Sequence, residues 1–390
     1  MAHSRAGRTP TCQPPLAGYN QPRPQVGRAG GVGVLRNKDI PLLKRWRIWL
    51  GILISLGSLY LALRNLQLAD VWDVARRAEY AWIVPGVAVY FAGVWARTWR
   101  WAYLLRPMKA VSLRRLFPVV VIGYMGNNVY PARAGELIRA YVLRQREGIS
   151  VSAALATVII ERVFDGLVML MFVFIGLPFT PMPAWLQWMV VAASLFFFGA
   201  LAVFMILAAK IEWAEATYRW AIDRIVPSRF RGSARGFADR FMVGLHSLRS
   251  GRDVLMLFVT SIVIWLAETV KYWFVMHAFD FSVPFWVLML MNGIVNLATT
   301  IPSSPGYVGT FDAPGIEILT IFGVPRSLAA SYTLILHAAL WLPITLLGFW
   351  YMGRESVSWR DFSRAEKSVT RPLAANQSST AENAESAEIS

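Results

Sequence analysis

The feature that most constrains this chain is a series of long apolar stretches between residues 48 and 350. Several of them approach the ~20 residues that an α-helix needs to cross the hydrocarbon core of a membrane. Only 16% of the 390 residues are charged, whereas soluble domains carry about a quarter. We therefore predict an all-α polytopic membrane protein whose strong spans lie at about 48–63, 81–101, 151–177, 185–209, 254–277 and 328–350.

Charged residues are segregated from these stretches. Nine of the 39 Lys and Arg residues precede Ile48, and the net charge of +16 comes from clusters that flank the apolar stretches. This distribution indicates membrane topology and no nucleic-acid partner, because no basic face is interleaved with exposed aromatic residues. We predict disordered cytoplasmic tails at 1–47 and 354–390 around a membrane domain at 48–353, with halves at about 48–177 and 185–350 and an amphipathic cytoplasmic loop at 210–253.

Two further apolar segments, 116–130 and 285–301, are interrupted. The predicted hinges are Pro131 and Gly135 in the first interruption, and Pro302, Pro305, Gly306 and Gly309 in the second. We expect Gly135 and Gly306 to adopt backbone angles that a side chain penalises. Irregular backbone at membrane depth is tolerated only where protein or a water-filled cavity satisfies its polar groups. The interruptions therefore imply a cavity.

Loop charges indicate whether the interrupted segments cross the membrane or turn back. With a cytoplasmic N-terminus and both segments turning back, the loop at 210–253, with nine basic and five acidic residues, faces the cytoplasm. The stretch 97–115, with six basic and no acidic residues, then also lies inside. Full crossing of the first segment would place 210–253 outside. We therefore predict six full transmembrane helices and two re-entrant hairpins, with eight full spans as the alternative.

The chain contains a weak internal repeat. A shift of 171 residues superposes Pro131 on Pro302, and a shift of 176 places His337 at the position of Glu161. In the predicted topology the two halves run in opposite directions and form an inverted repeat, an architecture that places a substrate site near the bilayer midplane. Chance agreement among apolar residues is the alternative. Recurrence of the motif P-x-x-x-G at both interrupted segments favours the repeat.

Ionisable residues occur deep inside two of the apolar stretches. Glu161, Arg162 and Asp165 lie about 16–22 Å from the start of their stretch, and Glu268 and Lys271 are similarly deep in theirs. Each such charge costs at least ~2.5 kcal/mol on insertion, so we expect these side chains to face a polar interior and to pair with one another. A buried structural network of ion pairs is the alternative to a substrate site.

Polar residues beside the first interruption extend this set. The fork of arginine suits phosphate oxygens, and helix N-termini offer N–H donors to anions, so a phosphate-bearing headgroup is the expected guest. Four cations (Arg133, Arg139, Arg162, Lys271) and four anions (Glu136, Glu161, Asp165, Glu268) predict a neutral cavity when all are ionised. The predicted headgroup-binding residues are Asn127, Asn128, Arg133, Glu136, Arg139, Glu161, Arg162, Asp165, Glu268, Lys271, Asn296, Asp312 and His337. Helix capping is the alternative role of the asparagines, and an interhelical hydrogen bond is that of His337.

Motifs of several enzyme classes are missing. The chain has no G-x-x-x-x-G-K-[ST], H-E-x-x-H or G-x-S-x-G motif, and its one cysteine, Cys12, allows no intrachain disulfide or thiolate metal site. We predict no catalytic residue, cofactor or metal, and we expect a protein that is not an enzyme. Any pumping would need an ion gradient or a partner.

Three runs carry a family resemblance: GYMGNNVYPARAGELIRAYVL (123–143), ATVIIERVFDGL (156–167) and IPSSPGYVGTFDA (301–313). They closely resemble the transmembrane region of lysylphosphatidylglycerol synthases, whose free-standing members are called flippase-like membrane proteins. The resemblance covers about 48–350 and implies translocation of a lipid, which is aminoacylated phosphatidylglycerol in the fused enzymes. Those enzymes continue into an aminoacyl-transferase domain, so that activity is not implied here. Asp312 stands where relatives carry Glu, which keeps the charge and shortens the reach.

The sequence therefore predicts a flippase or transporter for an anionic, phosphate-bearing lipid in the cytoplasmic membrane, with both termini in the cytoplasm. The expected partner is a membrane lipid, either an anionic phospholipid or a polyprenyl-phosphate-linked substrate, and a separately encoded lipid-modifying enzyme is a candidate second partner. One alternative is a membrane transferase acting on a polyprenyl-phosphate lipid, with Glu161, Asp165 or Glu136 as base. The other is a non-catalytic membrane subunit that recruits a soluble partner.

Overall fold

The computed structural model describes residues 68–130, 133–180, 183–209, 211–245, 250–300 and 304–354, and four residues before them, Leu53, Leu56, Gly57 and Tyr60. The chain divides into two units, Met1–Lys44 and Arg45–Ser390, and all described residues belong to the second. The predicted tails, most of the first predicted span and the hinge residues Pro131 and Pro302 lie outside the described residues.

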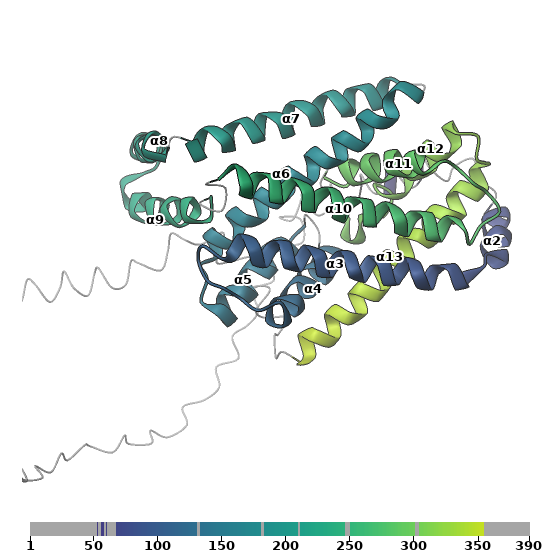
Figure 1. Ribbon diagram of the computed structural model, residues 1–390, viewed down its shortest axis with the longest axis horizontal. Helices are drawn as coiled ribbons and strands as arrows, with labels where there is room; N and C mark the ends of the chain where they lie inside the picture. Colours follow the sequence, from purple (N-terminus) through teal and green to yellow (C-terminus); the bar gives the residue numbers. More distant parts are fainter. Residues whose placement is uncertain are drawn as a thin grey trace, which may run out of the picture. The chain divides into compact units, whose positions relative to one another are not determined.

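All regular structure in the described residues is helical (Figure 1). The helices are α2 (Leu68–Arg77), α3 (Ile83–Leu105), α4 (Leu113–Val129), α5 (Gly135–Glu147), α6 (Val151–Gly176), α7 (Ala184–Ala209), α8 (Ile211–Ile225), α9 (Ser228–Leu245), α10 (Gly251–Met276), α11 (Phe285–Ala298), α12 (Asp312–Ile321) and α13 (Arg326–Arg354). Helices α3, α6, α7, α10 and α13 match five of the predicted spans to within a few residues. The all-α prediction is confirmed for this part of the chain.

Three of these helices are long and apolar enough to cross a membrane: α10, α13 and, within α7, Leu186–Val203. Helices α3 and α6 are also long, with 23 and 26 residues, but they carry buried ionisable side chains. Serine N-caps begin α6 and α10, where Ser150 and Ser250 accept hydrogen bonds from the backbone N–H groups of Ala153 and Asp253. The starts of α6 and α10 are therefore encoded locally.

Helices α3 and α10 run side by side through the centre of this unit (Figure 1). Gly86 of α3 allows the approach, because a Cβ atom there would lie 3.3 Å from the side chain of Val275. Further along, Arg97 and Glu268, which are 171 residues apart, form an ion pair. A contact between residues that the repeat makes equivalent is what a local two-fold axis between α3 and α10 would produce.

The other helix contacts also occur in equivalent sets. Helix α4 packs against α13 as α11 packs against α6, and α5 packs against α6 as α12 packs against α13. Each break also contains a residue with a positive φ angle outside the P-x-x-x-G glycines, 54° at Arg133 and 82° at Gly309. The second half therefore repeats the helix packing of the first.

Each interrupted segment folds into two short helices in contact with each other, α4 with α5 and α11 with α12. We call residues 130–134 the first break and residues 299–311 the second break. Helices α11 and α12, of 14 and 10 residues, are about 21 and 15 Å long, short of the ~30 Å of hydrocarbon. Lys109, before α4, lies 2.8 Å from the Glu147 carboxylate at the end of α5. The two ends of the first segment therefore meet.

Gly135, directly after the first break, and Gly306, in the second break, are required for different reasons. Gly306 has a φ angle of 73°, as expected for a position that penalises a side chain. Gly135 does not have a positive φ, so that part of the prediction is wrong. It is required by close packing instead, because a Cβ atom there would lie 1.9 Å from the carbonyl oxygen of Gly123.

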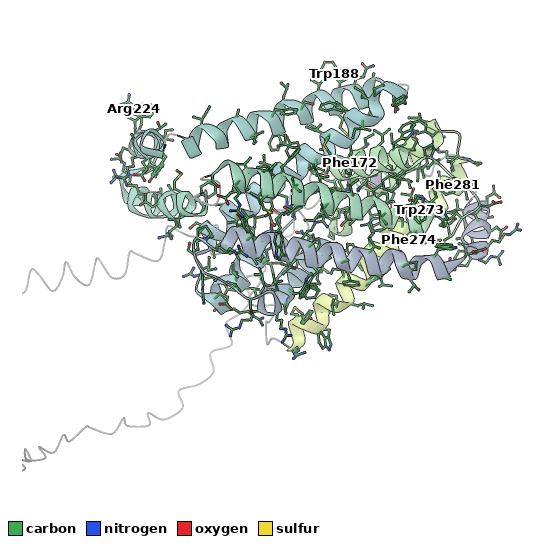
Figure 2. The ribbon with its side chains drawn as sticks, in the orientation of Figure 1. Phe172, Trp188, Arg224, Trp273, Phe274 and Phe281 are labelled. Carbon is green, nitrogen blue, oxygen red and sulfur yellow. The ribbon has the colours of Figure 1, made fainter. Side chains whose placement is uncertain are left out.

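Helix α7 lies at the periphery and packs against α6. Its outer side is apolar and exposed: Trp188 extends outward with 75% exposure, whereas Phe172 of α6 lies in the interior (Figure 2). Phe197 of α7 faces inward and lies on Gly166, where a Cβ atom would be 2.0 Å from the phenylalanine ring. Exposure of large apolar side chains is the expected surface of a helix in lipid.

Candidate functional site

A polar cavity of about 150 Å³ lies among α3, α4, α5, α6, α10, α11, α13 and the two breaks. Its volume has room for on the order of ten waters. The predicted residues that line it are Asn127, Asn128, Arg133, Glu136, Arg139, Arg162, Glu268, Lys271, Asn296 and His337, together with the hinge residues Gly135 and Gly306. The structure thus brings together side chains from both halves of the chain around one cavity.

Three predicted residues do not line the cavity. Glu161, Asp165 and Asp312 are almost fully buried behind it and bind protein side chains. Of the remaining predicted hinge residues, Pro305 begins a short turn at the second break, and Gly309 donates its backbone N–H to Asp312 at 2.8 Å. These residues support the walls of the cavity and do not face a guest directly.

Arg97, Glu268 and Lys271 form one buried ionic group between α3 and α10. Arg97 donates to Glu268 at 2.5 Å, and Lys271 donates to the other carboxylate oxygen of Glu268. Aromatic rings complete the shell, with Arg97 5.0 Å from the ring of Trp265 and Lys271 4.6 Å from that of Tyr90. Two cations share one carboxylate here, so the group has an excess positive charge.

Arg100 and Asp165 form a second buried pair. Arg100 Nη1 and Nη2 lie 2.6 and 3.1 Å from the two carboxylate oxygens of Asp165, the bidentate geometry that gives the strongest guanidinium pairs. Arg100 also donates to the hydroxyl of Ser261 at 2.6 Å and lies 3.5 Å from Glu161. This pair joins α3, α6 and α10.

Two arginine–glutamate pairs join α5 and α6. Arg139 of α5 donates to Glu161 of α6 at 2.5 Å, and Arg162 of α6 lies 3.1 Å from Glu136 of α5. Arg162 is also 3.7 Å from Asp165. The first hairpin, formed by α4 and α5, is therefore attached to α6 through guanidinium groups, which stay charged at every physiological pH.

Arg133 differs from the other arginines of the cavity. It donates to the backbone oxygen of Thr299 at 3.0 Å and lies 5.6 Å from the ring of Tyr307, so it links the first break to the second. Among the described residues it has no carboxylate partner, and its buried Nε has no hydrogen-bond acceptor. Its positive φ is unusual for a residue with a side chain, and such strain is often found at functional sites.

The cavity and its walls carry more positive than negative charge. Six cations, Arg97, Arg100, Arg133, Arg139, Arg162 and Lys271, stand against four anions, Glu136, Glu161, Asp165 and Glu268. The predicted neutral balance is wrong because it left out Arg97 and Arg100, which end the predicted span 81–101 and were counted with the basic stretch 97–115; both lie inside α3 and are 8% and 1% exposed. His337 and Asp312 add one charge of each sign when both are ionised, so with all groups ionised the described site has an excess of two positive charges.

His337 of α13 is held between two acceptors. Its Nδ1 lies 2.8 Å from an oxygen of Asp312, and its Nε2 lies 2.7 Å from the backbone oxygen of Gly306. The contact joins α13 to both α12 and the second break, so the interhelical role left open for this residue is present. His337 is also 13% exposed to the cavity, so a role toward water or a ligand stays a prediction.

Asn128 and Asn292 bind neighbouring helices, whereas Asn296 binds within its own helix α11. Asn128 donates to Thr345 of α13 at 2.8 Å, and Asn296 donates to Asn292 at 2.8 Å. Asn292 is fully buried and donates to Thr269 at 3.1 Å. Asn127 lines the cavity, and its buried side-chain oxygen has no donor among the described residues.

Sequence reasoning missed several residues of the cavity. Tyr90, Tyr124, Tyr307 and Trp341 line it, and Arg97 lies in its wall. Arg97 had a usable signal: it is one repeat length of 171 residues from Glu268, and an equivalent pair on two central helices can meet at a two-fold axis. The aromatic residues had no such signal, because aromatic side chains occur throughout the apolar stretches.

Comparisons with known proteins support the family resemblance of the sequence. The family described as lysylphosphatidylglycerol synthase TM region matches residues 48–348. A UPF0104 membrane protein of Methanothermobacter thermautotrophicus is 24% identical over 81% of this chain and 97% of that protein, and a second from the same organism is 26% identical over 70% and 84%. Glycosyltransferase AglD of Haloferax volcanii is 24% identical over 79% of this chain and 54% of that protein. No solved structure gives a significant match. With its apolar helices, this similarity makes the chain an integral multi-pass membrane protein.

Proposed function

On the premise that this chain belongs to the lysylphosphatidylglycerol synthase transmembrane family, we propose that it moves an anionic, phosphate-bearing lipid across the membrane. The observation that carries the proposal is the excess of two positive charges around a cavity at the breaks of both halves. An excess charge at membrane depth is expensive unless an anion compensates it. A phosphate diester supplies such an anion.

The donors of the cavity suit phosphate oxygens. Arg133 has donor capacity that no described residue uses, and Arg139 also has a buried Nε without an acceptor. Guanidinium groups bind phosphate through paired N–H donors, and they are stronger partners where water is scarce. Gly135, the first residue of α5, lines the same cavity, and its backbone N–H at the helix start adds to the donor set in this proposal.

Two neighbouring hollows support a lipid as the ligand. A polar hollow of about 210 Å³ shares Arg133, Glu136 and Arg162 with the cavity and reaches Phe197 of α7. An apolar hollow of about 680 Å³ lies among α6, α7 and α10 and is lined by side chains such as Leu167 and Phe258. The cavity itself is too small for acyl chains. In the proposed arrangement the headgroup binds at the arginines and the chains lie in apolar surroundings beside α7.

The proposed architecture is six full spans and two re-entrant hairpins in an inverted repeat. The protein would lie in the cytoplasmic membrane, with both termini in the cytoplasm. The short lengths of α11 and α12 support hairpins, as does the contact between Lys109 and Glu147. Eight full spans would separate those two residues by a bilayer. Arg106 and Lys109 keep the connection between α3 and α4 basic, which supports a cytoplasmic position.

Topology can be tested by cysteine labelling. In a Cys12→Ser background, we expect Arg144→Cys to resist an impermeant thiol reagent added outside intact cells, because the end of α5 faces the cytoplasm. Asp280→Cys, in the exposed connection after α10, is the matched control and should react. Labelling of both positions from outside, with the membrane intact, would rule out the hairpin arrangement.

Arg133→Gln tests the headgroup site. Because Arg133 has no carboxylate partner among the described residues, its removal strands no buried anion, unlike removal of Arg139. A hydrogen bond to a charged group contributes about 1.5–3 kcal/mol, so transport of anionic lipids should weaken about tenfold or more. Zwitterionic lipids should be affected less. The measurement is movement of fluorescent lipids of different headgroups in proteoliposomes, with membrane insertion checked separately.

The control is Arg235→Gln, which removes an arginine from the exposed pair with Asp223 on α8 and α9. It should leave every lipid at the wild-type rate. Wild-type rates for all lipids in Arg133→Gln would place the headgroup elsewhere, and no lipid movement by the wild-type protein would refute transport.

The match to glycosyltransferase AglD favours a second candidate function, a transferase acting on a polyprenyl-phosphate lipid. The matched part covers 54% of that protein, so its glycosyltransferase activity need not reside in the matched part. The same proteoliposomes separate the two functions, because a transporter returns lipid of unchanged mass whereas a transferase returns a heavier product.

A further inference from the structure

The contacts of His337 require one more proton than a neutral imidazole and an ionised carboxylate possess. Nε2 faces the backbone oxygen of Gly306, which can only accept, so Nε2 must carry a hydrogen. Nδ1 faces an oxygen of Asp312 at 2.8 Å, and that contact also needs a hydrogen, carried either by the ring or by the carboxyl group. A neutral imidazole has only one N–H. The pair therefore holds an additional proton and has no net charge.

The same positions of the first half lack this property. Glu161 and Glu136 lie 176 residues before His337 and Asp312, on the equivalent helices α6 and α5. There the two helices are joined by Arg139 and Arg162, which keep their protons. Helices α12 and α13 are joined by an imidazole, the side chain whose charge changes most readily near neutral pH. Among the described contacts, the helix pair α12 and α13 of the second half is therefore joined by a group that can titrate near neutral pH, whereas the equivalent pair α5 and α6 is joined by arginines that stay charged.

The His337–Asp312 pair lies where a proton can reach it from the cavity and where loss of that proton would change the structure. His337 lines the cavity, which has room for several waters, and is 13% exposed. Asp312 accepts the backbone N–H of Gly309, and His337 binds Gly306, so the pair fastens the second break to α13 at two points. Loss of the proton would leave a nitrogen lone pair facing an acceptor oxygen, and one of these hydrogen bonds must then break.

The surrounding ionisable groups are engaged elsewhere. The groups that line the cavity on elements next to α13 are Tyr90 and Arg97 of α3, Tyr124 of α4, Glu268 and Lys271 of α10, and Tyr307 of the second break. Glu268 pairs with Arg97 and Lys271, and Tyr307 lies beside Arg133. On α2, Asp70 and Asp73 are exposed. The described contacts give His337 one carboxylate partner, Asp312.

We propose that His337 and Asp312 bind one exchangeable proton, and that its release to water in the cavity frees the second break from α13 and couples lipid movement to proton movement. The coupling rests on the proposed lipid transport, whereas proton binding by the pair does not. No electron transfer or covalent bond is involved, because the proton passes between water and the pair.

The test uses the full chain in proteoliposomes that contain a fluorescent anionic lipid and a trapped pH indicator. Under an imposed pH gradient, wild-type protein should move lipid faster than without it and should carry protons with the lipid. His337→Gln and Asp312→Asn should both lose the gradient response and the proton flux. Asp312→Asn can keep all three hydrogen bonds with a neutral ring, since its amide N–H donates to Nδ1 and its oxygen accepts from Gly309. His277→Gln, at the end of α10, is the matched control and should retain both responses.

Spectroscopy on purified protein tests proton binding by His337 and Asp312 independently of lipid transport. In ¹⁵N-histidine NMR at neutral pH, the His337 signal, identified by its absence in His337→Gln, should show two protonated nitrogens, or else an infrared carboxyl band should vanish in Asp312→Asn. A singly protonated ring beside an ionised Asp312 overturns the inference, as does a wild-type gradient response in either variant. Failure of wild-type protein to move any lipid refutes transport and the coupling, and spectroscopy then decides whether the pair binds a proton.

Discussion

Replacing Gly135 with alanine is expected to destabilise the first hairpin by about 3 kcal/mol or more and to abolish lipid movement. The added Cβ would lie 1.9 Å from the backbone oxygen of Gly123 and 2.5 Å from the backbone nitrogen of Asn127. Backbone atoms cannot rotate away as a side chain can, so α4 and α5 would have to separate. Their separation would displace Arg139 from Glu161 and Arg133 from Thr299. The measurements are thermal unfolding in detergent and transport in proteoliposomes.

Gly199→Ala is the matched control for this change. Gly199 lies in the middle of α7, and no atom outside its own turn of helix lies within 4 Å of its ideal Cβ position. An alanine there should leave stability unchanged or raise it slightly, because alanine favours helix more than glycine does. Equal stability of the two variants would show that α4 and α5 do not pack closely at Gly135.

The second large effect is expected from Arg100→Met. Arg100 is 1% exposed, and its removal leaves Asp165, which is fully buried, without its bidentate partner. Breaking a buried pair by removing one member costs ~3–5 kcal/mol, because the remaining charge is uncompensated. Thermal unfolding in detergent measures this loss. Arg76→Ala, which breaks the exposed pair of Arg76 with Asp73, should change stability by about 1 kcal/mol or less.

Combining Arg100→Met with Asp165→Leu distinguishes a stranded charge from lost packing. If the penalty of the single variant is an unpaired Asp165, removal of both charges should restore part of the stability, since apolar pairs often replace buried ion pairs without loss. A double variant at least as unstable as Arg100→Met would contradict this account. The pair would then matter for its hydrogen bond to Ser261 and its ion pair with Glu161.

The sequence by itself determined the helix positions, because the membrane is a solvent that accepts a backbone only with its hydrogen bonds satisfied. Apolar stretches had to become helices, and α6 runs from Val151 to Gly176 where 151–177 was predicted. Proline and glycine marked the two breaks, since both disturb helix geometry for local reasons. Charges such as Glu161 and Asp165 had to be interior and paired, because lipid cannot solvate them. These conclusions depend on each residue and its neighbours in sequence.

Only the tertiary structure decided which charges meet and what their sum is. Arg97 and Arg100 lie near the end of an apolar stretch, where a loop and a helix are equally consistent with the sequence, and their burial required partners on α6 and α10. The need for glycine at Gly135 comes from the crossing of α4 and α5, which its own backbone angles do not reveal. The extra proton of His337 and Asp312 depends on two acceptors that face one ring. Pairing, close approach and proton count are properties of distances between segments, and no residue type fixes such distances along the chain.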